Sequence, residues 1–324
     1  MRERNLNIEL LKFLAVVLVA NSHMGLLYGK YSFLATGGAI GDALFFFVSG
    51  FTLFLSKSGG GNFGSWYKRR VSRIYPSVFA WALITSALNI VHRDMFEICL
   101  FGGGWFVSCI MLYYIVLFFV KKYAYQKPFV PFFGGVLLTL IWYYFEDKST
   151  YFIYSDAYFK WCYFFIFMLT GAYVGNGAIK LTSSVRKDIL FLCLSLAAFY
   201  GLFFCGSKLN NSMTMNFQIV SLLPLLGIVI FLYKLGTVSL VNRLMQTKAG
   251  LVLRAIGGLC LEAYIVQFVL FTDKMNHLFP ANIIIMFVYI LVVAYLTRSL
   301  GRLLLQTFRL EDYDWKTIFR IVDK

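Results

Sequence analysis

Charged residues are scarce in this sequence. They make up 14% of its 324 residues, whereas soluble globular proteins carry about 25%. The six cysteines form no C-x-x-C pair and stand alone within or beside apolar runs, so the sequence predicts neither a zinc site nor a disulfide framework. A Walker A motif is absent, and the glycine-rich stretch GGGNFG, residues 59–64, has no βαβ unit around it. These absences exclude a soluble globular protein and a dinucleotide-binding fold.

Hydrophobic side chains dominate what is present. They account for 60% of the sequence, and aromatic residues for 19%. This composition is typical of a polytopic membrane protein, whose spans must be helices because no water satisfies an open backbone in the bilayer. The sequence therefore predicts an all-α membrane protein with about ten transmembrane helices of about 20 residues each. Their approximate limits are 8–28, 39–56, 75–92, 105–121, 129–146, 159–176, 188–206, 215–233, 250–272 and 281–301.

Basic residues are distributed unevenly over the predicted loops. If the N-terminus is cytoplasmic, 23 of the 30 lysines and arginines fall on the cytoplasmic side and 6 on the outer side. The positive-inside rule favours this orientation, with both termini cytoplasmic. The same rule accounts for the net charge of +15, so we expect no nucleic-acid partner.

The predicted spans leave no room for a separate soluble domain. We expect one transmembrane domain, residues 1–306, and a cytoplasmic tail, residues 307–324. The tail alternates apolar and charged residues, which favours an amphipathic helix on the inner membrane surface. No small-residue cleavage site follows the first apolar run, so we expect that run to be retained as a membrane helix. The sequence does not indicate an oligomeric state.

The first predicted span carries three ionisable side chains, although such groups are costly in a membrane and usually functional. Lys12 and His23 are eleven residues apart, which places them within ~20° of each other around a helix and ~16 Å apart along it. Glu9 lies near the same face, three residues from Lys12. We interpret this stripe, accompanied by Asn21, as part of a site. The alternative is a purely structural one: Glu9 and Lys12 extend to the inner membrane interface, and His23 merely lies near the outer interface.

Four further residues stand out within or at the ends of predicted spans. Asp42 is an acid near the outer boundary, and Ser49 lies inside the same span, where close helix packing is the alternative explanation. Trp105 is the first residue of the fourth predicted span, on the outer side. It is expected to contact substrate, and an anchor in the aromatic belt is the alternative explanation. Glu262 lies within the ninth span, where a carboxyl group is not expected to face lipid.

A basic segment, WYKRRVSRIYP (residues 66–76), stands at the start of the third predicted span. Arg70 and Arg73 are three residues apart and hence neighbours on a helix. Two guanidinium groups on one face can hold a phosphate through paired hydrogen bonds, and Arg69 adds a further cation. Membrane topology together with binding of lipid headgroups is the alternative explanation.

Taken in order, these motifs resemble those of the acyltransferase 3 family, integral membrane enzymes that modify bacterial surface and secreted carbohydrates. The order is Lys12 and His23, then GDALFFFVSGF, RRVSRIYP, GGGWF and CLEAYIVQ. The resemblance runs from residue 5 to residue 301. Two positions depart from the family pattern: the first-helix cation is lysine where arginine is frequent, and Gln267 stands where the last motif often has histidine.

The resemblance implies a membrane O-acyltransferase of the bacterial cytoplasmic membrane, in which His23, Arg70 and Arg73 are essential. It implies acetyl-coenzyme A or another acyl-coenzyme A as donor substrate, with succinyl as an alternative to acetyl. The implied acceptor is a hydroxyl of a surface or exported glycan or of its lipid-linked precursor. We expect the donor to be bound by Lys12, Arg69, Arg70 and Arg73, and no permanently bound cofactor or metal.

In the mechanism we expect, His23 accepts the proton of the acceptor hydroxyl, because imidazole titrates near neutral pH. A carboxylate from another helix, Asp42 or Glu262, fixes its tautomer. A covalent acyl intermediate on His23 or Ser49 is the alternative to direct transfer. The candidate donors to the thioester oxygen are Lys12, Asn21 and Ser49. The expected substrate contacts are Asn21, Ser49 and Trp105.

A transporter or flippase without acyl transfer is the main alternative function, since ten helices with buried charges fit it too. Transporters favour helices broken near the midplane, which proline pairs mark. This chain has five prolines, of which only Pro224 lies clearly inside a predicted span. A non-catalytic membrane scaffold is a third interpretation, and it predicts that His23 can be replaced without consequence.

Overall fold

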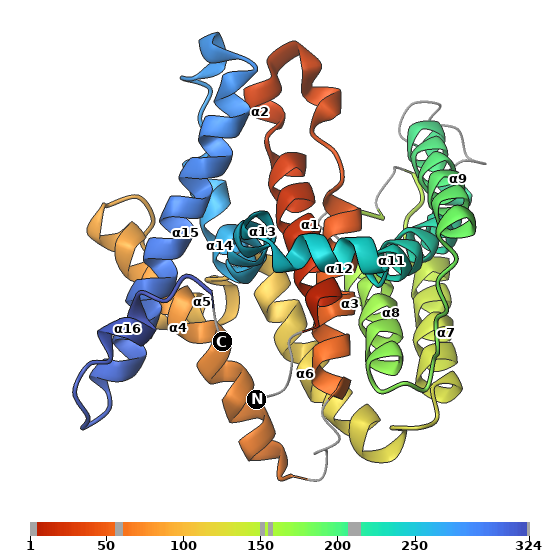
Figure 1. Cartoon of the computed structure of the whole chain (residues 1–324), viewed down its shortest axis with the longest axis horizontal. Coiled ribbons are helices and arrows are strands. Elements are labelled where there is room, and N and C mark those ends of the chain that lie inside the picture. Colours follow the sequence, from red (N-terminus) through yellow and green to blue (C-terminus); the bar gives the residue numbers. More distant parts are fainter. Residues whose placement is uncertain (1–4, 56–60, 150–152, 155–157, 207–214, 323–324) are drawn as a thin grey trace. The chain divides into compact units, whose positions relative to one another are not determined.

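The computed structural model describes residues 5–55, 61–149, 153–154, 158–206 and 215–322, and every regular element in these ranges is a helix (Figure 1). This confirms the all-α prediction. Residues 59 and 60 of the glycine-rich stretch lie outside the described ranges. The chain divides into two compact units. The first unit comprises residues 1–11, 42–60 and 119–247, and the second comprises residues 12–41, 61–118 and 248–324.

Among the described residues, six helical segments are long and apolar enough to cross a membrane. They are α1 (Leu6–His23), α3 (Gly38–Leu55), α6 (Gly104–Tyr123), α9 (Val185–Phe204), η3 with α11 (Gln218–Gly236) and α15 (Ala281–Thr307). A seventh candidate is the pair α13 (Lys248–Gly258) and α14 (Cys260–Leu270), bent by 66°. The predicted span 250–272 is therefore two helices. The break follows Gly257 and Gly258, whose low helix propensity favours an interruption there.

The remaining predicted spans correspond to shorter or more highly charged helices. The helices α7 (Phe129–Phe145) and α8 (Phe159–Gly175) have 17 residues each. The helix α4 (Phe63–Ala87) has 25 residues but carries the basic segment in its first half. A helix or a helix pair occurs in each of the ten predicted intervals. Ten membrane crossings and the cytoplasmic placement of both termini remain predictions.

The C-terminal tail is turned back against α15 instead of forming one long helix. Arg302 donates to the carbonyls of Thr317, Ile318 and Arg320 at 3.2, 3.3 and 2.7 Å. Of the amphipathic helix expected in the tail, the structure shows the four residues of α16 (Trp315–Ile318), and these bonds hold the end of α16 and the chain after it. Other short helices within the described ranges are α2 (Gly25–Tyr28), η1 (Gly29–Leu34), α5 (Met95–Phe101), α12 (Ser239–Gln246) and η4 (Asn276–Leu278).

In the first unit, α3 and α8 approach each other closely at glycines. A Cβ on Gly50 of α3 would lie 1.9 Å from the carbonyl oxygen of Met168, and one on Gly171 of α8 would lie 1.9 Å from that of Phe47. Such close packing leaves no space for a larger side chain. The helix α7 lies beside α8, and α9 lies beside α11, as Figure 1 also shows.

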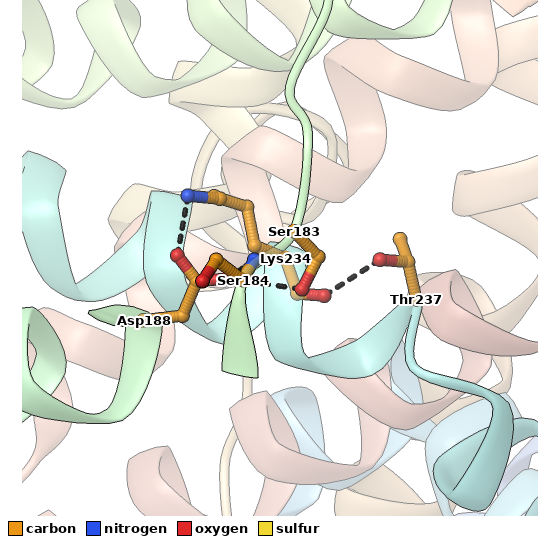
Figure 2. A network of polar contacts seen from close by, with 5 residues as sticks. All are labelled: Ser183, Ser184, Asp188, Lys234 and Thr237. Carbon is orange, nitrogen blue, oxygen red and sulfur yellow. Dashed lines mark hydrogen bonds and ion pairs between the residues drawn. The ribbon is translucent and has the colours of Figure 1, made fainter. Parts of the chain in front are cut away.

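An ion pair joins α9 to α11 in the first unit (Figure 2). Asp188, in the first turn of α9, is buried and pairs with Lys234, in the last turn of α11. The hydroxyl of Ser183 and the amide of Ser184 donate to the other carboxylate oxygen at 2.9 and 2.8 Å. An acid at a helix N-terminus and a cation at a C-terminus both complement the helix dipoles. The pair therefore stabilises the contact between these two helices.

In the second unit, α15 packs along α4 and beside α14. Gly301 of α15 permits a close approach, since a Cβ there would lie 2.9 Å from the carbonyl oxygen of Pro76 on α4. At the other end of α15, the buried Asn282 donates to the carbonyl of Leu27 at 2.9 Å. These contacts fix α4 and the segment that follows α1 to one long helix.

Candidate active site

His23 is the last residue of α1, and its ring packs against the ring of Phe268 on α14. The two ring centroids are 4.5 Å apart at an interplanar angle of 61°, an edge-to-face arrangement. The ring contacts continue from Phe268 to Tyr264 at 6.0 Å and from Tyr264 to Phe106 of α6 at 4.8 Å. An aromatic row thus holds the imidazole against α14, while much of the histidine side chain stays exposed.

Phe268 and Tyr264 also line a cavity of about 210 Å³. Its other walls come from the second half of α4, from α5 and from residues 102–104, which lead into α6. Gly104 has a φ of +64°, a conformation that residues with a Cβ rarely adopt. A Cβ there would also lie 3.6 Å from the hydroxyl oxygen of Tyr264. Phe268 thus packs against the imidazole of His23 and also forms part of the cavity wall.

Asn21 anchors the segment that follows α1. Its amide nitrogen donates to the carbonyls of Leu34 and Thr36 at 2.8 and 3.0 Å, and its oxygen accepts from the hydroxyl of Tyr28 at 2.6 Å. These three bonds give Asn21 a structural task beside His23. A contact from Asn21 to substrate, which the sequence suggested, remains a prediction.

The first-helix stripe rests on a continuous helix, since α1 runs without a break from Leu6 to His23. Lys12 and His23 both belong to the second unit, and Lys12 is half-buried. Their separation of eleven residues therefore corresponds to ~16 Å along one face of α1. Glu9 is buried and belongs to the first unit.

The basic segment forms part of α4, so the prediction that Arg70 and Arg73 are neighbours on a helix is confirmed. The guanidinium carbon of Arg70 lies 4.6 Å from the ring centre of Trp66 and 5.9 Å from that of Tyr114. Trp66 is held in turn by a hydrogen bond from its indole nitrogen to the carbonyl of Tyr114 at 3.2 Å. These cation–π contacts hold the guanidinium plane of Arg70 against two rings.

The three arginines of the segment differ in their surroundings. Arg70 is half-buried, and within the described part of the chain its buried Nε has no hydrogen-bond partner. Arg69 and Arg73 are exposed. Arg73 follows Arg70 by three residues and is thus adjacent to it on the helix surface, whereas Arg69 is turned by ~100°. Arg70 and Arg73 together can grip an anion, with Arg70 oriented in advance by its aromatic contacts.

Glu262, in the first turn of α14, accepts a hydrogen bond from the hydroxyl of Ser77 on α4 at 2.7 Å. Both side chains are buried. Glu262 precedes Phe268 by six residues, which places the two side chains ~120° apart around α14 and ~9 Å apart along it. Glu262 therefore fixes α14 to α4, while another face of α14 contacts His23.

Trp105 lies at the start of α6, next to the cavity wall. It is half-buried, and its ring meets that of Phe106 at a centroid distance of 5.9 Å. The neighbouring Gly104, and not the indole, lines the cavity. A direct contact of Trp105 with substrate remains a prediction.

Asp42 and Ser49 belong to the first unit, whereas the other predicted site residues belong to the second. Both are half-buried on α3. The charge of Asp42 interacts with that of Lys160 on α8, which is buried. Ser49 precedes Gly50, where α3 and α8 pack closely. The structure thus gives Asp42 a cationic neighbour within its own unit, and its role toward His23 remains a prediction.

Sequence reasoning did not identify the cavity. Its walls combine Trp81 and Thr85 of α4, Ile98 of α5 and Phe268 of α14, which are ordinary apolar or small polar residues in hydrophobic runs. The run of three glycines at residues 102–104 is the signal that could have pointed to it, because glycine permits conformations and close approaches that other residues do not.

Comparison with protein families agrees with the order of motifs along the chain. The family described as "Acyltransferase domain" matches residues 5–299, essentially the whole chain. No curated protein and no solved structure matches the sequence. Several apolar helices together with this family match indicate a multi-pass membrane protein. The chain belongs to the acyltransferase 3 family and is an acyltransferase.

Proposed function

We propose that the protein transfers an acyl group from cytoplasmic acyl-coenzyme A to a hydroxyl of a surface or exported glycan, or of its lipid-linked precursor, in a bacterial cytoplasmic membrane. The observation that carries the proposal is the contact of His23 with Phe268 at the wall of a cavity. The same compact unit holds Arg70 and Arg73. A candidate base and a candidate anion site thus occur in one unit.

Arg70 and Arg73 bind the phosphates of the donor in this proposal. Coenzyme A carries several phosphates, which suit two guanidinium groups on one helix face. The aromatic contacts of Arg70 support this role, because an arginine that is already oriented loses less conformational freedom when an anion binds. Arg69 and Lys12 add positive charge to the same unit.

The transfer step needs a hydroxyl made nucleophilic and a thioester made electrophilic. His23 accepts the hydroxyl proton as the acceptor oxygen bonds to the thioester carbonyl carbon. The carbon–sulfur bond then breaks, and the thiolate of coenzyme A takes the proton from His23. The products are an ester and free coenzyme A, so atoms and charge balance without a metal or a redox partner. Acetyl is the simplest acyl group for this step.

Glu262 has a positioning role in this proposal. Its hydrogen bond to Ser77 supports such a role, because α14 also carries Phe268, the aromatic contact of His23. That the carboxylate of Asp42 or of Glu262 orients the imidazole remains a prediction from the sequence. The main alternative function is a transporter without acyl transfer. The bent pair α13–α14 favours it, because transporters often have broken helices. Membership of an acyltransferase family makes the enzymatic interpretation the better one.

The test is binding of radiolabelled acetyl-coenzyme A to purified protein in detergent, with slow thioester hydrolysis recorded separately. Arg70→Ala should weaken donor binding roughly 10- to 100-fold, because a hydrogen bond to a charged group contributes about 1.5–3 kcal/mol. Arg186→Ala is the matched control, since Arg186 is an exposed arginine in the first unit. If the wild-type protein shows no affinity for acetyl-coenzyme A, the proposed donor is wrong. Equal losses in both variants would argue for a general charge effect.

A further inference from the structure

The cavity beside Phe268 has mainly apolar walls. Three of the polar side chains that line it, those of Thr85, Ser86 and Arg93, each donate to a backbone carbonyl. Thr85 donates to a carbonyl of its own helix at 3.0 Å, Ser86 to a loop carbonyl at 3.3 Å, and Arg93 to the carbonyl of Phe101 at 3.0 Å. A sugar buried here would face mostly carbon with its hydroxyls, and a buried unsatisfied hydroxyl is costly. The cavity therefore suits a hydrocarbon group.

The cavity lies within reach of a donor molecule whose phosphates are bound at Arg73, and it also lies beside His23. Trp81, in its wall, follows Arg73 by eight residues on the continuous helix α4, so the two residues are ~12 Å apart along that helix. At the cavity, Phe268 also contacts the ring of His23. A donor held by its phosphates at Arg73 can thus extend its thioester end along α4 toward the cavity and the imidazole.

We propose that this cavity receives the acyl group of the donor and sets its permitted length; this inference rests on the proposed function. Its volume of about 210 Å³ exceeds what an acetyl group fills. An engineered apolar cavity of about 150 Å³ already holds benzene. The cavity accepts acyl groups longer than acetyl, and butyryl-coenzyme A binds more tightly than acetyl-coenzyme A.

The experiment compares the affinities of coenzyme A, acetyl-coenzyme A and butyryl-coenzyme A by calorimetry. It uses the full-length His23→Ala protein in detergent, so that no donor is consumed. Each buried methylene group strengthens binding about fourfold, so butyryl-coenzyme A should bind about 15-fold more tightly than acetyl-coenzyme A. Ala82, which is half-buried in the cavity wall, provides a site for filling the cavity. Adding Ala82→Leu should reduce the 15-fold preference to about one, with acetyl-coenzyme A affinity changed by less than about threefold.

The matched control is Ala87→Leu, the same substitution at the exposed last residue of α4. This variant should keep the 15-fold preference. A variant of opposite effect, Phe101→Ala, enlarges the cavity and should extend the preference to hexanoyl-coenzyme A. It also keeps the proposal testable if Ala82→Leu does not fold.

Several results would overturn the proposal. Equal affinities for acetyl- and butyryl-coenzyme A, or a butyryl preference that Ala82→Leu leaves intact, would place the acyl group elsewhere. A loss of affinity for the sugar probe 4-nitrophenyl glucoside in Ala82→Leu, with donor binding unchanged, would assign the cavity to the acceptor. If coenzyme A itself does not bind, the proposed function fails and the acyl pocket fails with it. If coenzyme A binds but chain length has no effect, only the pocket fails.

Discussion

Charged side chains away from solvent have different kinds of partners in the two units of this protein. In the first unit, Asp188 has an ion pair with Lys234 and hydrogen bonds from Ser183 and Ser184. In the second unit, the half-buried Arg70 rests on two aromatic rings, and within the described residues its Nε lacks a hydrogen-bond partner. The first arrangement pairs its charges within the protein, whereas the second leaves a buried donor of the cation without a hydrogen bond in the described part of the chain.

This difference separates structural from functional charge in a sequence where both kinds occur inside hydrophobic runs. A saturated ion pair stabilises the contact of two helices, and removing one partner leaves a buried charge uncompensated. A half-buried cation held against aromatic rings has no counter-charge to lose, so its replacement leaves no buried charge uncompensated. We therefore expect substitutions in the first group to change stability, and those in the second to change donor binding.

The largest expected effect is on stability, at the ion pair of the first unit. Asp188→Ala should lower the free energy of unfolding by about 3 kcal/mol, because Lys234 then lacks its counter-charge. The measurement is unfolding by SDS titration in mixed micelles. Affinity of the remaining folded protein for acetyl-coenzyme A should not change. The double variant Asp188→Ala/Lys234→Met should be less destabilised than Asp188→Ala. If it is more destabilised, the pair is not the source of the effect.

Packing glycines in the first unit should give the next largest effect. Gly171→Ala adds a Cβ 1.9 Å from the carbonyl oxygen of Phe47, so α3 and α8 must move apart. We expect a loss of about 1–3 kcal/mol in the same unfolding measurement. Gly201→Ala on α9 is the matched control, since its Cβ has no atom within 4 Å and alanine favours the helix. Equal destabilisation of both variants would contradict the close approach of α3 and α8.

Arg70→Lys tests whether geometry, and not charge alone, matters in the second unit. Lysine keeps the positive charge but loses the planar fork and much of the ring stacking. The affinity for acetyl-coenzyme A should fall about tenfold, a change of about 1.4 kcal/mol, with little change in unfolding. Arg186→Lys should leave both quantities unchanged. A full retention of affinity in Arg70→Lys would reduce the role of Arg70 to a point charge.

The smallest effect concerns the tail in the second unit. The side chain of Thr317, and then its amide, donate to the carboxylate of Asp314, which lowers the pKa of that group. A lowered pKa means that the helix cap is fully formed above the ordinary value for aspartate, about 4, and is lost as the pH falls further. The ¹⁹F NMR signal of 5-fluorotryptophan at Trp315, assigned through Trp315→Phe, should report this transition. Asp314→Asn should remove it, and a transition that persists in this variant would show that another group titrates.

The sequence predicts those features of the fold and the site that depend on neighbouring residues. Helical spacing alone places Lys12 and His23 on one face of α1 and makes Arg70 and Arg73 neighbours on α4, and the structure confirms both helices. Each of the ten predicted apolar runs likewise contains a helix or a helix pair, whereas short helices such as α5 and α12 lie outside these runs. Such features follow from local periodicity, which one segment of chain carries within itself.

The features that escaped prediction depend on contacts between distant segments. Ser77 and Glu262, which hold α14 to α4, are 185 residues apart. The cavity is formed by four separate segments, none of which has a distinctive composition apart from the glycines at 102–104. The bend between α13 and α14 was missed because a glycine pair within an apolar run also fits a continuous membrane helix.

The role of His23 in the chemical step is tested by comparing His23→Ala with His277→Ala, both in the second unit. Donor binding and thioester turnover are measured on the same preparations. We expect His23→Ala to bind acetyl-coenzyme A with unchanged affinity but to turn it over about 10²- to 10⁴-fold more slowly, because it has lost its general base. His277→Ala, an exposed histidine of η4, should match the wild type in both. Wild-type turnover in His23→Ala would contradict the assignment of the imidazole to the chemical step.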